Sequence, residues 1–321
     1  MIRYGIDLGA DHIRLISKED GVVFDEPCMI AYDRRKRVLA IGNDAKEMKH
    51  LQDDNIKVIS PLSLNEIDFD ALTDLVQNLC YQFNVFRVFS KTELIFSYPT
   101  SLTQEQCNDL KQSLLDLGAS KVYFDQEIWM SAIGANLDLF LPVSSCVLNI
   151  GSLNCDIALF TSGEMQHKST YPYAGKHINI LIGNWLKDYY GVIVSESMKE
   201  KIKFKLGYIG NVSQVEKMQI QGLDITTKQM KVVMISNEEV SKVIEPLVNG
   251  WEEWISKFLC SLSQVQQQDV KLRGIVCCGG TMLQPGIQKH FQNALQCPIY
   301  ITDDPKHTVI QGLEMLLNRM E

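Results

Sequence analysis

Two segments of this chain end an apolar run with residues suited to phosphate binding. Tyr4-Gly-Ile-Asp-Leu-Gly9 supplies an acid, Asp7, and a glycine, and Leu148-Asn-Ile-Gly-Ser152 has the same shape with Asn149 in place of the acid. A carboxylate at such a strand end would position Mg²⁺ and its waters, and small residues let backbone N–H groups close on phosphate oxygens. The two segments predict a pair of phosphate-binding hairpins, one of which has lost its acid.

A third segment, Val276-Cys-Cys-Gly-Gly-Thr-Met-Leu283, places Gly279, Gly280 and Thr281 directly after an apolar run. A glycine pair at a strand-to-helix junction lets the backbone approach a nucleotide, and a helix N-terminus favours anionic or polar groups. Each of the three segments alone also fits an ordinary turn. Their order and separation together are more specific and predict a nucleotide site.

The elements that must position these turns form two similar series. The first series is expected to comprise strands over 3–8, 13–17, 21–24, 93–98 and 122–124 with helices over 45–51, 67–83, 104–117 and 127–136. The second is expected to comprise strands over 146–150, 156–160, 164–171, 274–278 and 299–301, a β-rich insertion over 216–235, and helices over 179–190, 195–206, 238–262 and 307–319, with another opening at 279–280. This duplication predicts two α/β domains around a shared cleft.

Composition narrows the classes of protein. With 321 residues, 45% of them hydrophobic, the chain is long enough for two packed cores. A net charge of −8 argues against a nucleic-acid partner. Nine cysteines without a metal-binding spacing predict reduced structural thiols in a cytosolic protein. No run is apolar enough for a membrane span, and the N-terminus leads directly into a strand pattern, so no signal peptide is expected.

The chain resembles the MreB family of bacterial actin homologues over nearly its whole length. The likeness is carried by Asp25-Glu-Pro27, Leu39-Ala-Ile-Gly42, Tyr98-Pro99 followed by Thr103, Glu127 followed by Ser131-Ala-Ile-Gly-Ala135, Gly222-Leu-Asp224 and Asp303-Asp-Pro305. It implies an actin-like ATPase fold of class α/β, with two related domains around a nucleotide cleft. Domain I would hold 1–138 plus about 303–321, with a small insertion at about 31–60, and domain II 139–302, with an insertion at about 179–245.

The resemblance also implies roles for individual residues. Glu127 would orient the attacking water, Asp7 would be catalytic and position Mg²⁺, and Glu200 and Lys203 would contact ribose and adenine. A helix N-terminal carboxylate explains Glu127 equally well, and a solvated i,i+3 pair explains the other two. The positions assigned to ATP or ADP are Gly9, Ala10, Asp11, Asn149, Gly151, Ser152, Asn154, Gly175, Lys176, Glu200, Lys203, Gly279, Gly280 and Thr281.

Departures from the family pattern concentrate at the phosphate turns. Ala10 replaces a hydroxyl, Asp11 adds an acid, and Asn149 replaces an acid. Leu153 replaces a glycine and would crowd a tight turn, whereas Lys176 adds a cation where the family has an acid. Catalysis of phosphoryl transfer depends on preorganised charge. These changes therefore predict ATP hydrolysis that is slow or lost, with nucleotide binding retained.

Phenylalanines beside basic residues mark one further segment, Phe83-Asn-Val-Phe-Arg-Val-Phe89. It falls where members of the MreB family carry a membrane-insertion loop, which would assign Phe86, Val88 and Phe89 to the membrane. The alternative is that these side chains pack beneath the neighbouring helix.

The leading functional hypothesis is a cytoskeletal subunit that assembles with itself or with paralogous MreB-like subunits into filaments supporting cell shape. Its expected location is the cytoplasm, at the inner face of the cell membrane. One alternative is an active ATPase or kinase of the same fold class. Another is a regulator that does not polymerise and instead modulates an active paralogue.

Overall fold

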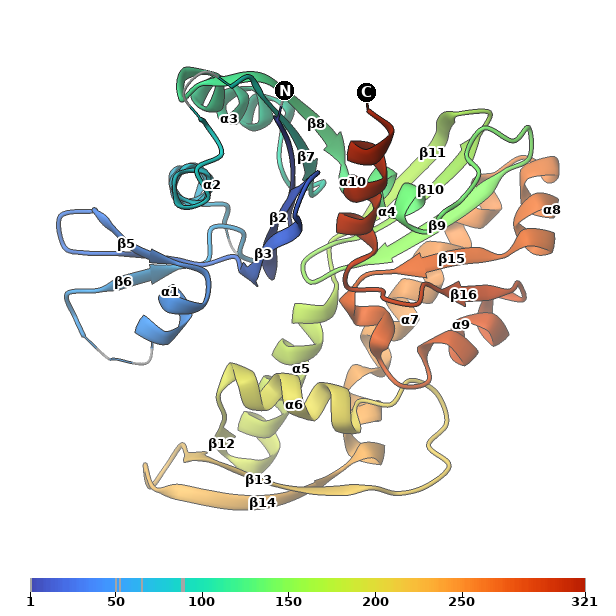
Figure 1. Cartoon of the computed structure of the whole chain (residues 1–321). Helices are drawn as coiled ribbons and strands as arrows, with labels where there is room; N and C mark the ends of the chain where they lie inside the picture. Colours follow the sequence, from blue (N-terminus) through green and yellow to red (C-terminus); the bar gives the residue numbers. More distant parts are fainter. Residues whose placement is uncertain (1, 50, 52, 65, 88–89, 321) are drawn as a thin grey trace. The chain divides into compact units, whose positions relative to one another are not determined.

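The computed structural model describes residues 2–49, 51, 53–64, 66–87 and 90–320. The chain divides into two compact units, residues 1–137 with 307–321 and residues 138–306. Each unit is an α/β body with its own sheet and core (Figure 1). The domain boundaries expected from the family resemblance stay a prediction. None of the helices in the described part of the chain has the length and apolar composition that crossing a bilayer requires.

The first unit is built on a five-stranded sheet of order β3-β2-β1-β7-β8. Its strands are β1 (Ile2–Leu8), β2 (His12–Ser17), β3 (Gly21–Pro27), β7 (Thr92–Tyr98) and β8 (Ala119–Gln126). Strands β1, β2 and β3 are antiparallel neighbours, whereas β7 and β8 run parallel to β1. A small sheet of order β5-β4-β6 contains β4 (Ile30–Tyr32), β5 (Val38–Ile41) and β6 (Lys57–Ile59).

The helices of the first unit are α1 (Gly42–Met48), α2 (Phe69–Gln82), α3 (Gln104–Asp116), α4 (Glu127–Gly134) and α10 (Thr308–Arg319). The C-terminal helix α10 lies against α4 and β1 (Figure 1). Its apolar residues recur at helical spacing, and Val309, Leu313 and Leu317 are buried with Ile16 and Ile95 of the sheet. This core therefore joins the first strands of the chain to its last helix.

The second unit repeats the sheet topology in the order β11-β10-β9-β15-β16. Its strands are β9 (Ser145–Ile150), β10 (Cys155–Thr161), β11 (Glu164–Tyr171), β15 (Ile275–Cys278) and β16 (Ile299–Ile301). Three antiparallel strands are again followed by two parallel ones. The duplication predicted from the sequence is therefore present in the strand order of both units.

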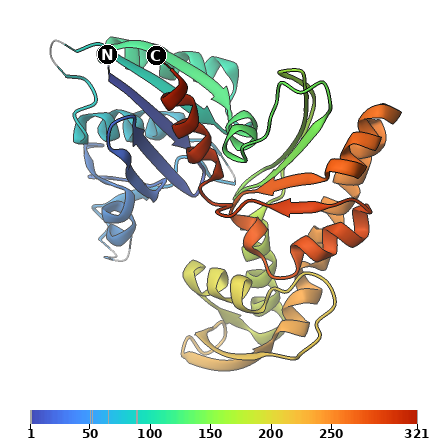
Figure 2. The same cartoon turned by 45° about the vertical axis from the view of Figure 1, so that its right-hand side comes forward.

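A second small sheet, of order β12-β13-β14, contacts helices α5, α6 and α7 of this unit (Figures 1 and 2). Its strands are β12 (Val192–Ile193), β13 (Lys217–Asp224) and β14 (Met230–Ser236). The helices of the unit are α5 (Gly175–Tyr190), α6 (Glu196–Leu206), α7 (Asn237–Ser261), α8 (Gln264–Arg273), the 3₁₀ helix η1 (Gly280–Leu283) and α9 (Ile287–Leu295). Helix α7 begins with a complete capping box between Ser236 and Glu239, as its sequence predicts.

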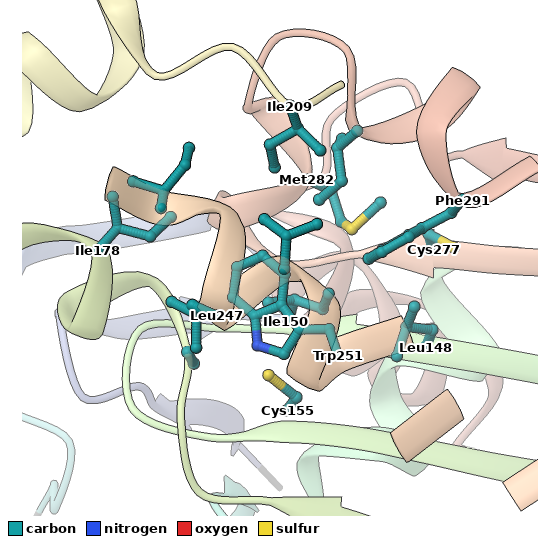
Figure 3. Packing of buried hydrophobic residues seen from close by; sticks show 14 of the residues in the cluster. Leu148, Ile150, Cys155, Ile178, Ile209, Leu247, Trp251, Cys277, Met282 and Phe291 are labelled. Atoms are coloured by element: carbon teal, nitrogen blue, oxygen red, sulfur yellow. The ribbon is translucent and has the colours of Figure 1, made fainter. Parts of the chain in front are cut away.

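The core of the second unit lies between its large sheet and helices α5, α7 and α9. Figure 3 shows Leu148 and Ile150 of β9 in this core together with Trp251, Met282 and Phe291. Trp251 is fully buried, and its indole N–H donates to the Tyr173 carbonyl at 2.6 Å. Because Leu148 and Ile150 point into the core, the intervening Asn149 is fixed at the opposite face of the sheet.

Candidate functional site

Gly9, Ala10 and Asp11 form the turn between β1 and β2, here called the first turn. A Cβ added to Gly9 would overlap the His12 carbonyl oxygen, so the turn is too tight for a larger residue at that position. Gly9 and Ala10 are half-buried, and Asp11 is exposed with its Oδ2 3.0 Å from His12 Nδ1. Asp7, at the end of β1, is only 2% exposed.

Asp7 is tied to a residue that the sequence analysis did not single out. The Arg14 guanidinium on β2 donates through Nη1 to Asp7 Oδ2 at 2.8 Å, and its Nε lies 2.9 Å from Asp25 Oδ1 on β3. Burial raises the pKa of Asp7, and the positive charge of Arg14 opposes that shift. Burial alone would lower the pKa of Arg14, but the two carboxylates outweigh it and the pKa is raised, so the guanidinium stays charged.

The residues at the first turn do not fit a Mg²⁺ ion. Mg²⁺ requires near-octahedral oxygen ligands and keeps several waters. One oxygen of Asp7 already accepts from a guanidinium, and a divalent cation beside it would face the charge of Arg14. The expected role of Asp7 in positioning Mg²⁺ therefore has no support in this geometry.

The other residues predicted in the first unit lie on different elements. Glu127 is the first residue of α4 and is half-buried. Phe86 is half-buried, and a Cβ added to Gly118 would lie 3.8 Å from its Cβ. Val88 and Phe89 lie outside the described residues. The membrane assignment of this segment stays a prediction.

In the second unit, two turns and the start of α5, which are distant in sequence, meet at the carbonyl group of Gly151. The second turn, Gly151 to Asn154, joins β9 to β10. The Gly151 carbonyl accepts from the Gly175 N–H at 3.2 Å and from Thr281 Oγ1 at 2.7 Å. The neighbouring Lys176 N–H donates to the Ser152 carbonyl at 2.8 Å. The N-terminus of α5 and the 279–281 segment are therefore held directly against the second turn.

Gly279, Gly280 and Thr281 form what is here called the glycine turn, which leads from β15 into η1. Gly279 has a φ of +92°, and a Cβ at this position would overlap Asn149 Oδ1 and the Ile150 carbonyl. A Cβ at Gly280 would instead meet only Lys306 Cγ at 3.6 Å and Cε at 3.8 Å. The turn is therefore closed on the Asn149 side and open at Gly280. The helix that the sequence predicted to open here is a short 3₁₀ helix.

The remaining predicted residues of the second turn are fixed by the sheet. Asn149 is 3% exposed and in register with Cys278 of β15 and Asp156 of β10. Ser152 and Asn154 are half-buried. Leu153, expected to crowd the turn, is a buried side chain.

Glu200 and Lys203 lie on α6 and pair with each other, Nζ to Oε1, at 2.7 Å. The Asn179 amide on α5 donates to Glu200 Oε2 at 2.7 Å. Buried Gln284 donates from Nε2 to the carbonyls of Lys203, at 2.6 Å, and of Gly207. These bonds hold α5, α6 and the end of η1 together.

Four residues around Glu200 and Lys203 were not singled out in the sequence analysis. Two are the amides Asn179 and Gln284, and the others are Phe204 and Lys306. The Lys203 and Lys306 ammonium groups lie 4.7 and 5.6 Å from the centre of the Phe204 ring. Nothing in the local pattern around these residues indicates a contact between them, because their elements meet only in the folded unit.

Replacing Thr281 with valine is expected to weaken the junction at the Gly151 carbonyl, where the second turn, the start of α5 and the glycine turn meet. The change removes the hydroxyl that donates to the Gly151 carbonyl but leaves the Gly175 N–H as a second donor, so the expected loss of unfolding free energy is about 1 kcal/mol. Urea unfolding would measure it, with Thr281→Ser as a control that keeps the hydroxyl. Equal stability of the valine and serine variants would contradict the structural role of this bond.

Comparison with known proteins agrees with the predicted fold. The structure of MreB5 of Spiroplasma citri bound to AMPPNP superposes with a TM-score of 0.90 at 25% sequence identity, covering 98% of this chain and 95% of that one. The MamK double helical filament gives a TM-score of 0.81 at 17% identity, which supports the fold alone. The predicted actin-like α/β fold is therefore confirmed.

Sequence relatives carry the comparison further. The Bacillus subtilis cell shape-determining protein Mbl is 27% identical over 319 residues, covering 99% of this chain and 96% of that protein. The Escherichia coli cell shape-determining protein MreB is 26% identical over 326 residues, with 97% and 93% covered. Residues 2–321 match the profile of the MreB/Mbl protein family. The chain belongs to the MreB/Mbl family, as its sequence motifs predict.

Proposed function

We propose that this protein is an actin-like cytoskeletal subunit that binds an adenine nucleotide, assembles into filaments supporting cell shape, and hydrolyses ATP slowly or not at all. The observation that carries the nucleotide part is the meeting of the second turn, the start of α5 and the glycine turn at the Gly151 carbonyl. This junction fixes the glycine turn, which is open at Gly280, and a glycine at such a position lets a nucleotide approach the backbone closely. The related MreB5 structures are bound to AMPPNP and to ADP.

The proposed site has a phosphate side and a nucleoside side. The first and second turns and the start of α5 would contact phosphates, with Glu127 orienting water and Asp7 at the end of β1. The glycine turn with Glu200 and Lys203 would contact ribose and adenine. The domain bounds that the family resemblance implies, residues 1–138 with about 303–321 for domain I and residues 139–302 for domain II, place the first turn, Asp7 and Glu127 in domain I and the other residues of the proposed site in domain II.

Slow or absent hydrolysis follows from the charges at the two turns. Asn149 is an amide where the family resemblance implies an acid, and Asp7 is engaged by Arg14. Loss of one preorganised charged or polar group costs about 10²–10³-fold in the rate of a reaction of this kind. At these two strand-end positions, therefore, one carboxylate is engaged by a guanidinium and the other is absent.

Self-assembly and membrane contact are the remaining parts of the proposal. Filament formation is supported by the family and by the likeness to the MamK filament subunit. A peripheral position at the inner face of the cell membrane rests on the segment around Phe86, which carries Arg87 and Lys91 among its neighbours. Paralogous subunits of the same family are the other expected partners.

Phosphate release from ATP, measured with Mg²⁺ and lipid vesicles at a protein concentration that gives pelletable polymer, tests the proposal. We expect polymer in the pellet and phosphate release about 10²–10³-fold slower than that of a family member with intact turns. Glu127→Ala is expected to lower the residual rate further, because Glu127 is the residue assigned to orient the attacking water.

The controls separate the parts of the proposal. Turnover equal to that of the intact family member, and abolished by Glu127→Ala, would contradict the slow ATPase and keep the filament. Pelleting only in the presence of an active paralogue would contradict self-assembly and favour the regulator. Nucleotide binding is measured in parallel by calorimetry, so that loss of binding is not mistaken for loss of hydrolysis.

A further inference from the structure

A row of polar residues crosses the whole sheet of the first unit. Neighbouring strands place Asp25 of β3 opposite Arg14 of β2, Arg14 opposite Asp7 of β1, Asp7 opposite Ser97 of β7, and Ser97 opposite Asp125 of β8. Residues in register on adjacent strands share one face of a sheet. These five residues, here called the polar row, lie on the face that α10 covers, because Gly5 and Ile95, two positions back on β1 and β7, contact or pack with α10.

Arg14 is the cation of the polar row and is enclosed by its neighbours. Its side chain is 10% exposed and lies between the carboxylates of Asp7 at 2.8 Å and Asp25 at 2.9 Å. The other oxygen of Asp25 lies 2.9 Å from Nε2 of His307, at the start of α10. The guanidinium is planar and fixed in direction by two partners on different strands, so it is part of the folded sheet and not a loose surface charge.

The equivalent row in the second unit carries no such cation. There Thr170, Asp156, Asn149 and Cys278 occupy the register positions on β11, β10, β9 and β15. The place of Arg14 is taken by Asp156, which accepts from Thr170 Oγ1 at 2.6 Å and pairs with Lys168 at 3.4 Å. The place of Asp7 is taken by the uncharged Asn149. Of the two strand-end positions, therefore, only one carries a carboxylate, and Arg14 neutralises it.

A metal ion bound between a carboxylate and a phosphate reduces the repulsion between these two negative groups. Here Arg14 of the same hairpin already pairs with Asp7, and the equivalent position in the second unit is an uncharged amide. The remaining acid of the first turn, Asp11, is exposed and lies 3.0 Å from His12 Nδ1. The strand-end carboxylate that would face a divalent ion is thus paired in the first unit, and the equivalent position of the second unit has none.

We infer that Arg14 is the resident cation of the first turn, and that this chain binds adenine nucleotides without needing Mg²⁺. The inference rests on the proposed function, which places nucleotide phosphates against the first turn. Arg14 lies outside the motif Asp7-Leu-Gly9 and outside the residues that the family resemblance singles out. Its pairing with Asp7 explains why the residues of the first turn fit Mg²⁺ poorly.

Calorimetry with ATP and with ADP, each in excess Mg²⁺ and in EDTA, tests the inference on the wild-type protein. We expect dissociation constants that agree within about twofold between the two conditions, because no free energy of binding depends on the metal. A wild-type affinity that falls about tenfold or more in EDTA would overturn the inference while leaving the proposed nucleotide binding intact. Absence of binding in both conditions would refute the proposed function and the inference with it.

A charge-matched variant tests the part played by Arg14. Arg14→Leu combined with Asp25→Asn removes one positive and one negative charge, so the net charge of Asp7, Arg14 and Asp25 stays at −1 while Asp7 is released. We expect this variant to bind ATP about tenfold more tightly in Mg²⁺ than in EDTA. Adding Asp7→Asn to it should abolish the difference.

Arg14→Lys is the matched control that keeps the cation, and it should bind nucleotide equally in Mg²⁺ and EDTA. A double variant that still ignores Mg²⁺ would overturn the role of Arg14. Circular dichroism spectra of all variants establish that they are folded. Should the double variant not fold, the comparison of wild type with Arg14→Lys in the two conditions remains decisive, since a Mg²⁺ requirement in either protein contradicts the inference.

Discussion

Replacing Arg14 with leucine is expected to lower the free energy of unfolding at pH 7 by about 3–5 kcal/mol, because it leaves Asp7 buried without its charge partner. The Asp7 side chain is 3% exposed and that of Arg14 10%, so water cannot take over the role of the guanidinium without opening the sheet. Urea unfolding of the two proteins measures the difference.

The expected loss depends on pH in a defined direction. The pKa of Asp7 is already raised by burial, and removing Arg14 raises it further. A carboxyl group whose folded pKa lies above its unfolded pKa destabilises the folded state as pH rises through the interval between them. The stability deficit of Arg14→Leu should therefore shrink as pH is lowered into that interval, where the folded state protonates Asp7.

Two variants control this result. Arg14→Leu combined with Asp7→Asn removes both members of the buried pair and should recover most of the lost stability, because neutral residues can replace a buried pair at little cost. Arg14→Lys keeps a positive charge and should lose less than the leucine variant. A double variant as unstable as Arg14→Leu alone would show that packing of the arginine stem, not the uncompensated charge, determines the effect.

Replacing Gly279 with alanine is expected to disrupt both the stability of the second unit and nucleotide binding. Its φ of +92° and ψ of 148° lie in a region that side chains avoid, at a cost of about 1–3 kcal/mol. The added Cβ would also overlap the Ile150 carbonyl and Asn149 Oδ1, so β9 and β15 would have to separate. Urea unfolding and ATP calorimetry on the same preparation measure the two effects.

Gly280→Ala is the matched control from the neighbouring position. Its Cβ would meet Lys306 Cγ at 3.6 Å, an ordinary contact, so the stability of the unit should change by less than about 0.5 kcal/mol. Nucleotide affinity should nevertheless fall, since the methyl group would occupy the open side of the glycine turn. Unchanged ATP affinity in a folded Gly280→Ala protein would contradict a nucleotide approaching the turn at this residue.

Periodicity was sufficient to predict the repeated strands and most helices, because buried strands and amphipathic helices leave regular apolar patterns. It failed where regularity is weak. Helix α8, whose residues are mostly polar, was not predicted, and α5 begins at Gly175 instead of Asn179. Between Gly175 and Asn179 the only apolar side chain is that of Ile178, so no repeat marks this first turn, where Ala174 donates its N–H to the His177 ring.

The candidate site was predictable where it lies in short motifs and not where it depends on register. The short motifs at the ends of the apolar runs were enough to identify Asp7, Gly151, Gly279 and Thr281. Arg14 gave a weaker signal, a charge within an apolar strand, whose meaning depends on its being opposite Asp7 and Asp25. Gln284 joins carbonyl groups that lie about eighty residues away in the chain, so no local pattern could indicate it.

The first unit is discontinuous in the chain, because its core contains Val309, Ile310, Leu313 and Leu317 of α10. A ribosome makes β1 before the second unit and α10 after it. The second unit, residues 138–306, is continuous and is complete before α10 emerges. The apolar face that contains Ile16 and Ile95 is therefore not covered by α10 until the second unit has been synthesised. The first unit can complete its core only after α10 has been synthesised.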